Sequence, residues 1–244
     1  MIGIVDWGIG GVSIYRLIKE RMPEAAILYF SDTGAMPYGK MGRRELASRL
    51  DSVIGYLKSQ GMTRLVIGCN AASTAIPDLA DQGIKIDGVI EPAVAAATKL
   101  RPIALGVIGG RRTIVSGVYR KAFAAQGIDI DQRIAQPLSG LIESGDTSSE
   151  MLQGEARRIL SPLKNCSHIL LACTHYPAIE GVLRDYVSRS AKFIDPAAAV
   201  VNKLGKINSI GEDRFFTTGD ARQMKRSAKL AFNVEIGSVE KVRF

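Results

Sequence analysis

The chain has 244 residues, 46% hydrophobic and 23% charged, so it is long enough for one large globular domain or for two domains of about 100 residues each. No apolar run approaches the roughly 18 residues that span a bilayer, and the N-terminus is typical of a first strand rather than of a signal peptide. The net charge of +8 comes from basic residues spread along the chain without a nucleic-acid-binding module, so we attribute it to a solvated surface and expect neither a nucleic-acid nor a membrane partner.

The cysteines and histidines limit the metal and redox chemistry that the chain can perform. Three cysteines, an odd number, argue against a disulfide framework and for the reducing cytosol, so we expect a cytoplasmic protein. The chain has no C-x-x-C motif, and its only histidines are His168 and His175, so the sequence indicates no zinc site.

The first half of the chain alternates short apolar runs with longer amphipathic segments. The apolar runs predict strands at 1–5, 26–30, 64–68 and 88–90. Apolar residues at helical spacing predict helices at 12–21, 43–60, 76–82 and 93–100. Glycines follow the first of these strands, and a cysteine follows the third.

The same order of segments restarts after residues 100–102. Strands are predicted at 103–108, at 168–172 and within 193–196 and 215–220, with short extended segments at 128–130 and 134–135. Helices are predicted at 114–126, 150–163, 178–189, 197–206 and 221–232, and 138–146 is either a loop or the start of a helix. The alternation predicts an α/β chain of two similar parallel-sheet domains related by pseudo-twofold symmetry.

Two cysteines stand at equivalent places in the two halves. Cys69 and Cys173 each follow an apolar run and precede small polar residues at a probable helix start, where ligands bind in open α/β sheets. The helix dipole and nearby N–H groups lower the pKa of a thiol in such a place. An isolated cysteine is usually inert core, which is our interpretation of Cys166. The repeated context favours a reactive pair in one site closed by both halves.

Other polar residues lie close to these turns. Asp6 ends the first strand before Gly8-Ile9-Gly10-Gly11, and because residue 13 is serine the dinucleotide fingerprint fails, which leaves a tight turn whose N–H groups can hold an anion. His175 can exchange a proton with Cys173 two residues earlier, although taken alone it is better explained as a hydrogen-bonded core residue. Asp32 and Glu143 are single loop carboxylates that spacing alone does not select.

Taken together, these stretches resemble the glutamate racemases of the cofactor-independent aspartate/glutamate racemase superfamily, over essentially the whole chain. The resemblance rests on Asp6 with Gly8-Ile9-Gly10-Gly11, Asp32-Thr33, Pro37-Tyr38-Gly39, Cys69-Asn70, Glu91-Pro92-Ala93-Val94, Gly106-Val107-Ile108-Gly109, Glu143-Ser144-Gly145, Cys173-Thr174-His175-Tyr176-Pro177 and Thr218-Gly219-Asp220. It implies two α/β domains, at 1–98 plus 208–244 and at 99–207, with the active site in the cleft between them. It also implies that neither pyridoxal phosphate nor a metal is used, and that a homodimer is to be considered.

The resemblance further implies a role for each candidate residue. Cys69 and Cys173 are the two acid/bases, one removing the α-proton of an amino acid and the other protonating the opposite face. Asp6 tunes Cys69, and His175 tunes Cys173. The carboxylates expected to assist are Asp32 and Glu143, and the groups expected to bind the amino acid are Asn70, Thr113, Thr174 and the loop Pro37-Tyr38-Gly39.

Three residues depart from the family's pattern of small hydroxyl side chains. Relatives usually carry serine where Trp7 stands and threonine where Ala71 and Gly110 stand, and Trp7 and Ala71 fall at substrate-contacting positions. Losing a hydroxyl against a charged ligand costs roughly 1–3 kcal/mol. Three hypotheses therefore stand: a glutamate racemase that supplies D-glutamate for peptidoglycan, a related racemase or isomerase for aspartate or another amino acid, and a ligand-binding protein with little turnover.

Overall fold

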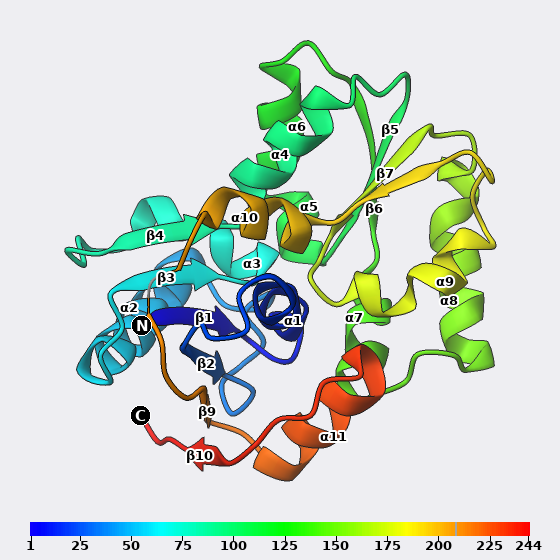
Figure 1. The fold of residues 1–244 in the computed structure, drawn as a ribbon. Helices are drawn as coiled ribbons and strands as arrows, with labels where there is room; N and C mark the ends of the chain where they lie inside the picture. The colour runs from blue at the N-terminus through cyan, green and yellow to red at the C-terminus, as the bar shows by residue number, and fades with distance from the viewer. Residues whose placement is uncertain (208) are drawn as a thin grey trace.

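A computed structural model describes residues 1–207 and 209–244, which form two parallel sheets flanked by helices (Figure 1). The strands are β1 (Ile2–Asp6), β2 (Ile27–Ser31), β3 (Arg64–Ile67), β4 (Lys85–Gly88), β5 (Leu105–Gly109), β6 (Ile130–Ile134), β7 (His168–Ala172), β8 (Lys192–Ile194), β9 (Arg214–Thr217) and β10 (Val239–Lys241). The first sheet has the strand order β10-β9-β2-β1-β3-β4, and the second has the order β6-β5-β7-β8. The predicted α/β class is confirmed.

The two sheets repeat one topology. The run β2-β1-β3-β4 of the first sheet corresponds strand for strand to β6-β5-β7-β8 of the second. Cys69 follows β3 and Cys173 follows β7, so the two cysteines occupy equivalent positions. The C-terminal strands β9 and β10 extend the first sheet beyond this repeat.

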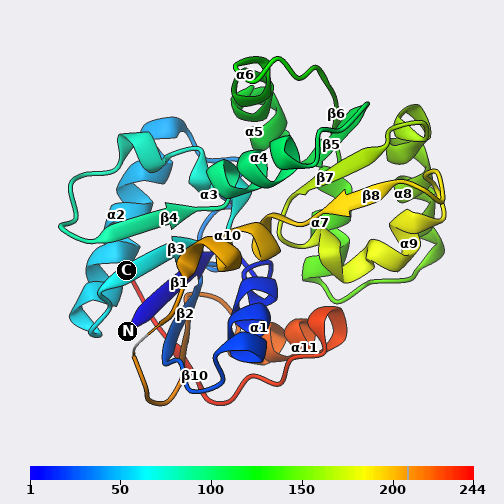
Figure 2. The same cartoon turned by 45° about the horizontal axis from the view of Figure 1, so that its top comes forward.

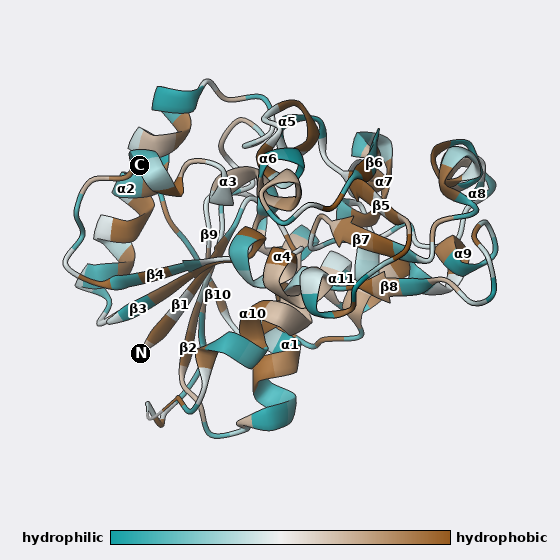
Figure 3. Cartoon of the chain, turned by 90° about the horizontal axis from the view of Figure 1, so that it is seen from above, coloured by the Kyte–Doolittle hydropathy of each residue, from teal (hydrophilic) through white to brown (hydrophobic). Residues whose placement is uncertain are grey.

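Helices cover both faces of each sheet. The α-helices are α1 (Val12–Arg21), α2 (Arg43–Ser59), α3 (Asn70–Ser73), α4 (Ile90–Lys99), α5 (Arg111–Val115), α6 (Val118–Ala124), α7 (Gln136–Glu143), α8 (Glu150–Leu160), α9 (Glu180–Arg184), α10 (Pro196–Leu204) and α11 (Ala221–Phe232). The described residues also contain three 3₁₀ turns: η1 (Ile76–Asp78), η2 (Ser161–Leu163) and η3 (Tyr176–Ile179). The central strands β1, β5 and β7 are almost fully buried, which explains why they are continuous apolar runs rather than alternating ones (Figure 3).

The two sheets are joined by shared packing. Helix α10 crosses from β8 back toward the first sheet and lies between the two (Figure 2), packing on both α1 and α4. Helix α4 shares a buried cluster with β5 and β7 of the second sheet. Our division of the chain at 98/99 and 207/208 remains a prediction, and residue 208 lies outside the described residues.

Several predicted elements differ in extent from the observed ones. The helix predicted at 76–82 is only the turn η1, after which Leu79 is extended. The helix predicted at 114–126 is interrupted at Gly117, whose φ of 69° lies in the left-handed region, and gives α5 and α6. The segment 178–189 holds only the end of η3 and the short helix α9. Residues 138–146, left open between loop and helix, contain most of α7.

Two edge strands also differ from the prediction. The strand expected at 88–90 is β4 at Lys85–Gly88, where Asp87 is buried and forms an ion pair with Arg64. The sequence did not reveal this strand because charged and apolar residues alternate in it. The charge of its buried Asp87 is neutralised by Arg64, which is distant in the sequence. Strand β10 was not predicted, since its three residues, Val-Glu-Lys, carry almost no apolar signal.

No helix in the described ranges is both long and apolar enough to cross a membrane.

The residue that caps α10 makes stability depend on pH. Burial raises the pKa of Asp195 to about 6 from its ordinary 3.8, although it accepts a hydrogen bond from the Ala197 amide. At this residue the folded protein therefore binds more protons than the unfolded chain between about pH 4 and 6, and the residue's contribution to stability falls as pH rises through that range.

We expect Asp195→Asn, which preserves the cap, to abolish this decline and to raise the free energy of unfolding at pH 7.5 by roughly 1–3 kcal/mol. Urea denaturation from pH 4 to 8 measures the effect. The control is Asp220→Asn at the exposed cap of α11, which keeps Asp195 and should retain the decline. An unchanged pH profile in Asp195→Asn would contradict the assignment.

Candidate active site

A cavity of about 280 Å³ lies between the carboxyl ends of the two sheets. Its walls come from the turns after β1 and β3 on one side and after β5 and β7 on the other. Every predicted site residue lines this cavity except Glu143 and Asp32. The position agrees with the rule that ligands bind beyond the carboxyl ends of parallel strands.

The glycine turn after β1 lies directly against groups from the second sheet. A Cβ atom at Gly8 would lie 2.1 Å from Oε2 of Glu143, and one at Gly10 would lie 2.5 Å from Oγ1 of Thr174. The amide of Ile9 donates to Oε2 of Glu143 at 2.9 Å. The predicted anion-holding turn therefore binds a carboxylate of the protein itself, and only glycine permits this approach.

Cys173, His175 and Glu143 form a chain of polar contacts. Nδ1 of His175 lies 3.6 Å from Sγ of Cys173, and Nε2 lies 2.7 Å from Oε2 of Glu143. Burial by itself lowers the pKa of His175, but the Cys173 sulfur and the Glu143 carboxylate outweigh it, and the net pKa lies well above its usual value. An imidazolium is thus favoured at neutral pH, and it can stabilise a Cys173 thiolate.

The surroundings of Cys69, by contrast, favour its protonated thiol. Burial raises the pKa of the Cys69 thiol well above its usual range, and the negative charges of Asp6 and Cys173 add to the increase. Burial also raises the pKa of Asp6, whose carboxylate accepts hydrogen bonds from the Gly8 amide and the Thr174 hydroxyl. The site therefore pairs a sulfur next to a cation with a sulfur that retains its proton.

Asp32 does not line the cavity, but it is hydrogen-bonded to Tyr38, which does. It is fully buried, forms an ion pair with Arg49 at 2.6 Å, and accepts hydrogen bonds from the hydroxyls of Tyr38 and Thr218. The loop Pro37-Tyr38-Gly39, which does line the cavity, is thus anchored to the first sheet through Tyr38. The assisting role expected for Asp32 stays a prediction, and its contacts are with the protein.

The three departing residues all line the cavity. The half-buried ring of Trp7 is fixed by a hydrogen bond of 3.1 Å from Nε1 to the Ala35 carbonyl, so it both packs and forms part of the wall. Next to Gly110, Oε1 of Gln136 accepts the Arg111 amide and lies 3.1 Å from where a Cβ at residue 110 would be. A threonine at 110 would therefore be in tight contact with the end of the Gln136 side chain, which would have to shift slightly.

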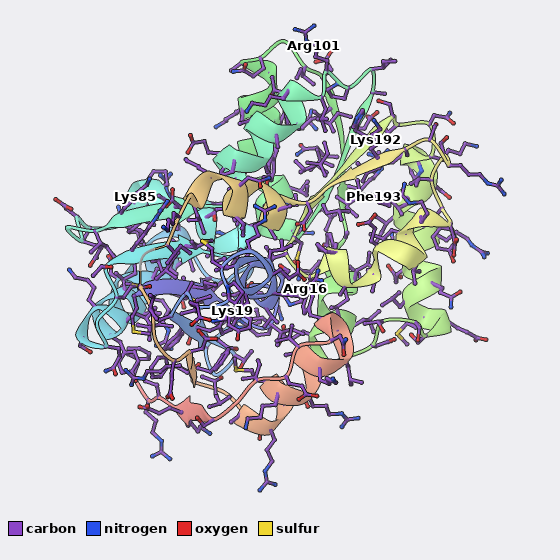
Figure 4. The ribbon with its side chains drawn as sticks, viewed as in Figure 1. Arg16, Lys19, Lys85, Arg101, Lys192 and Phe193 are labelled. Atoms are coloured by element: carbon purple, nitrogen blue, oxygen red, sulfur yellow. The ribbon has the colours of Figure 1, made fainter. Side chains whose placement is uncertain are left out.

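Sequence reasoning missed several lining residues. Lys40 and Arg111 are exposed basic residues of the wall, and Gln136 lies beside them. No spacing signal distinguishes these from other polar surface residues. The basic residues Lys85, Arg101 and Lys192, by contrast, lie at the periphery of the molecule, as expected for a solvated surface (Figure 4).

Across residues 1–207 and 209–244, no three histidine, cysteine, aspartate or glutamate side chains are grouped as the ligands of a metal would be. That no metal is needed stays a prediction.

Comparison with known proteins places this geometry in a family. The model of the Asp/Glu/Hydantoin racemase family matches residues 2–204. A glutamate racemase of Gloeobacter violaceus is 30% identical over 241 residues, which cover 93% of this chain and 91% of that protein. One of Pseudomonas entomophila is 33% identical, covering 91% of this chain and 86% of that protein. The chain belongs to the Asp/Glu/hydantoin racemase family.

Solved structures agree with this assignment. The glutamate racemase isoform RacE1 of Bacillus anthracis superposes with a TM-score of 0.87 at 26% identity, covering 100% of this chain and 97% of that one. A glutamate racemase of Francisella tularensis, solved in complex with D-glutamate, also gives 0.87, at 25% identity and with 99% and 97% coverage.

Removing the charge of Glu143 should deactivate Cys173. Glu143→Gln keeps hydrogen-bonding atoms beside His175 and Ile9 but lowers the pKa of His175, so the imidazolium that stabilises the thiolate is lost. We expect alkylation of Cys173 by iodoacetamide at pH 7 to slow about tenfold or more. Peptide mass spectrometry measures the rate, and Glu180→Gln on the surface is the control. Equal rates from pH 6 to 9 in Glu143→Gln and wild type would refute the pairing.

Proposed function

We propose that this protein is an amino-acid racemase that interconverts L- and D-glutamate without a cofactor, using Cys69 and Cys173 as its two acid/bases. One observation carries the proposal: the two sulfurs follow equivalent strands of two repeated sheets and line one cavity. Inverting a stereocentre requires proton-transferring groups on opposite faces, and this repeat supplies one on each side of the cavity.

The two environments suggest how a cycle begins. Cys173, beside the His175 imidazolium, takes the α-proton as a thiolate, which leaves a carbanion on the substrate. Cys69, kept protonated by burial and by Asp6, gives its proton to the opposite face. Sulfur charge has then moved from Cys173 to Cys69, and the reverse reaction or proton exchange after release restores the start. The reaction needs no net oxidant or reductant.

The surrounding groups lower the barrier. The α-proton of an amino acid is a very weak acid, so the carbanion requires electrostatic stabilisation in a cavity that excludes water. The Thr174 hydroxyl is bound to Asp6, and Asn70 and Thr113 are buried in the wall, so these groups are fixed before substrate arrives. We assign binding of the amino acid to Asn70, Thr113, Thr174 and the loop Pro37-Tyr38-Gly39.

Glutamate is the first substrate to test because the relatives named above are glutamate racemases, and because exposed Lys40 and Arg111 offer positive charge to a second carboxylate. The lining by Trp7, Ala71 and Gly110 favours a second candidate, aspartate or a less acidic amino acid, since these positions supply no hydroxyl. We further propose a cytoplasmic enzyme that supplies D-glutamate for peptidoglycan, with a homodimer as the assembly to test.

The first experiment is α-proton exchange in heavy water with each enantiomer of glutamate, aspartate and other amino acids, followed by mass spectrometry and optical rotation. Exchange with inversion for glutamate supports the proposal. Inversion of a different amino acid alone would support the second candidate. No exchange with any amino acid, in a folded and reduced sample, would refute racemase function.

Each single cysteine variant should abolish racemisation. We expect Cys69→Ser and Cys173→Ser to lose about a hundredfold or more in kcat, because a serine hydroxyl is a far weaker acid than a thiol and is hardly ever ionised at neutral pH. Any residual exchange should involve opposite enantiomers in the two variants, since each retains one sulfur. Cys166→Ala, in the core away from the cavity, is the control. Undiminished racemisation in either serine variant would rule out the two-base mechanism.

Restoring hydroxyls should favour glutamate if the departures restrict it. In the double variant Trp7→Ser, Ala71→Thr, we expect kcat/KM for glutamate to rise about threefold to tenfold, the value of one or two new hydrogen bonds. Steady-state racemisation of each glutamate enantiomer, followed by circular dichroism, measures kcat/KM. The single variant Ala71→Ser should give a smaller rise. If kcat/KM does not rise in a folded sample, these residues do not limit glutamate use.

A further inference from the structure

A hydrogen bond buried behind the cavity joins Tyr119 to Asn70. The Tyr119 hydroxyl, on α6 beside the second sheet, donates to Oδ1 of Asn70 at 2.6 Å. Asn70 directly follows Cys69 at the end of the first sheet's β3, lines the cavity and is 3% exposed. Tyr119 is fully buried and its ring stacks on Phe123. The bond therefore joins helix α6, which packs on the second sheet, to the residue that follows Cys69.

This bond determines which way the Asn70 amide faces. A buried hydroxyl must donate its hydrogen, and among the described residues Oδ1 of Asn70 is the only acceptor recorded for Tyr119. Burial and the charge of Cys173 raise the pKa of Tyr119 far above the neutral range, so the hydroxyl keeps its proton. If the amide were flipped, an N–H₂ group would face an O–H donor with no acceptor left for it.

The other end of the amide lacks a partner. Within the described part of the chain, Nδ2 of Asn70 is buried and makes no hydrogen bond. An unsatisfied buried donor is costly, and natural structures retain one mainly where something else completes it. The cavity beside Asn70 is the route by which an acceptor can arrive, and an amino acid carries such acceptors in its carboxylate oxygens.

We propose that Tyr119 is a positioning residue whose hydroxyl fixes the Asn70 amide so that Nδ2 donates to a carboxylate oxygen of the bound amino acid. The inference rests on the proposed function and deepens it. Tyr119 acts through Asn70 and transfers no proton, so its removal affects substrate binding more than the chemical step.

The experiment is a double-mutant cycle on racemisation. Tyr119→Phe keeps the ring, and we expect KM for both glutamate enantiomers to rise about fivefold to tenfold while kcat changes less than about twofold. Asn70→Ala should raise KM at least as much. The double variant should lose no more than Asn70→Ala alone, because the hydroxyl acts only through the amide. Additive losses, as from general loosening of the packing, would overturn the proposal, as would an unchanged KM in Tyr119→Phe.

Two further variants keep the test decisive. Asn70→Asp preserves the acceptor for Tyr119 but removes the donor, so it should raise KM at least as much as Asn70→Ala; an unchanged KM would overturn the proposal even if Tyr119→Phe does not fold. Tyr186→Phe, on a half-buried tyrosine outside the cavity, is the matched control and should keep the wild-type KM. Absence of exchange with any amino acid in the wild type refutes the proposed function as well, whereas normal wild-type activity with an unaffected Tyr119→Phe refutes this inference alone.

Discussion

The contact between the Gly8–Gly10 turn and Glu143 is the constraint on which the site depends. The turn follows β1 of the first sheet, while Glu143 ends α7 and Thr174 and His175 follow β7 of the second sheet. Because no side chain intervenes, the Ile9 amide can hold the carboxylate that in turn holds His175. The Glu143 carboxylate therefore both joins the two halves of the molecule and contacts His175, and a side chain at residue 8 would disturb both contacts.

The electrostatics of the cavity follow from that contact. The charges of Glu143 and Cys173 contribute to the pKa shifts of three buried neighbours, Asp6, Cys69 and His175. Four full negative charges in a buried space would be prohibitive, and the rise in the pKa of Asp6 and Cys69 limits them. His175 supplies a positive charge where the second sheet's sulfur needs it. A bound amino acid adds an ammonium group, which complements this excess of acidic groups.

The sequence predicted the repeated parallel-sheet architecture because buried parallel strands are continuous apolar runs, and it predicted the cysteine turns because they recur. Prediction from the sequence failed where the deciding contacts join residues that are distant in the sequence. Strand β4 is concealed by a buried Asp87 whose partner, Arg64, lies on β3. Tyr119 resembles any core aromatic residue until the fold brings its hydroxyl to Asn70, and Gln136 gives no sign that its amide contacts the Arg111 amide next to Gly110. Residues that act across the two sheets have no local pattern.

The repeat is symmetric in topology but not in chemistry, and the asymmetry is what a racemase with two sulfurs requires. In the mechanism we propose, if both sulfurs had the environment of Cys173, neither would have the carboxylate neighbour that helps to keep Cys69 protonated. If both had that of Cys69, neither would be a base at neutral pH. The structure instead places His175 beside Cys173, and it places Asp6 where its charge raises the pKa of Cys69. Because each turnover of the proposed mechanism moves a proton from one sulfur to the other, the difference between the two environments cannot be large without trapping the enzyme after one direction of reaction.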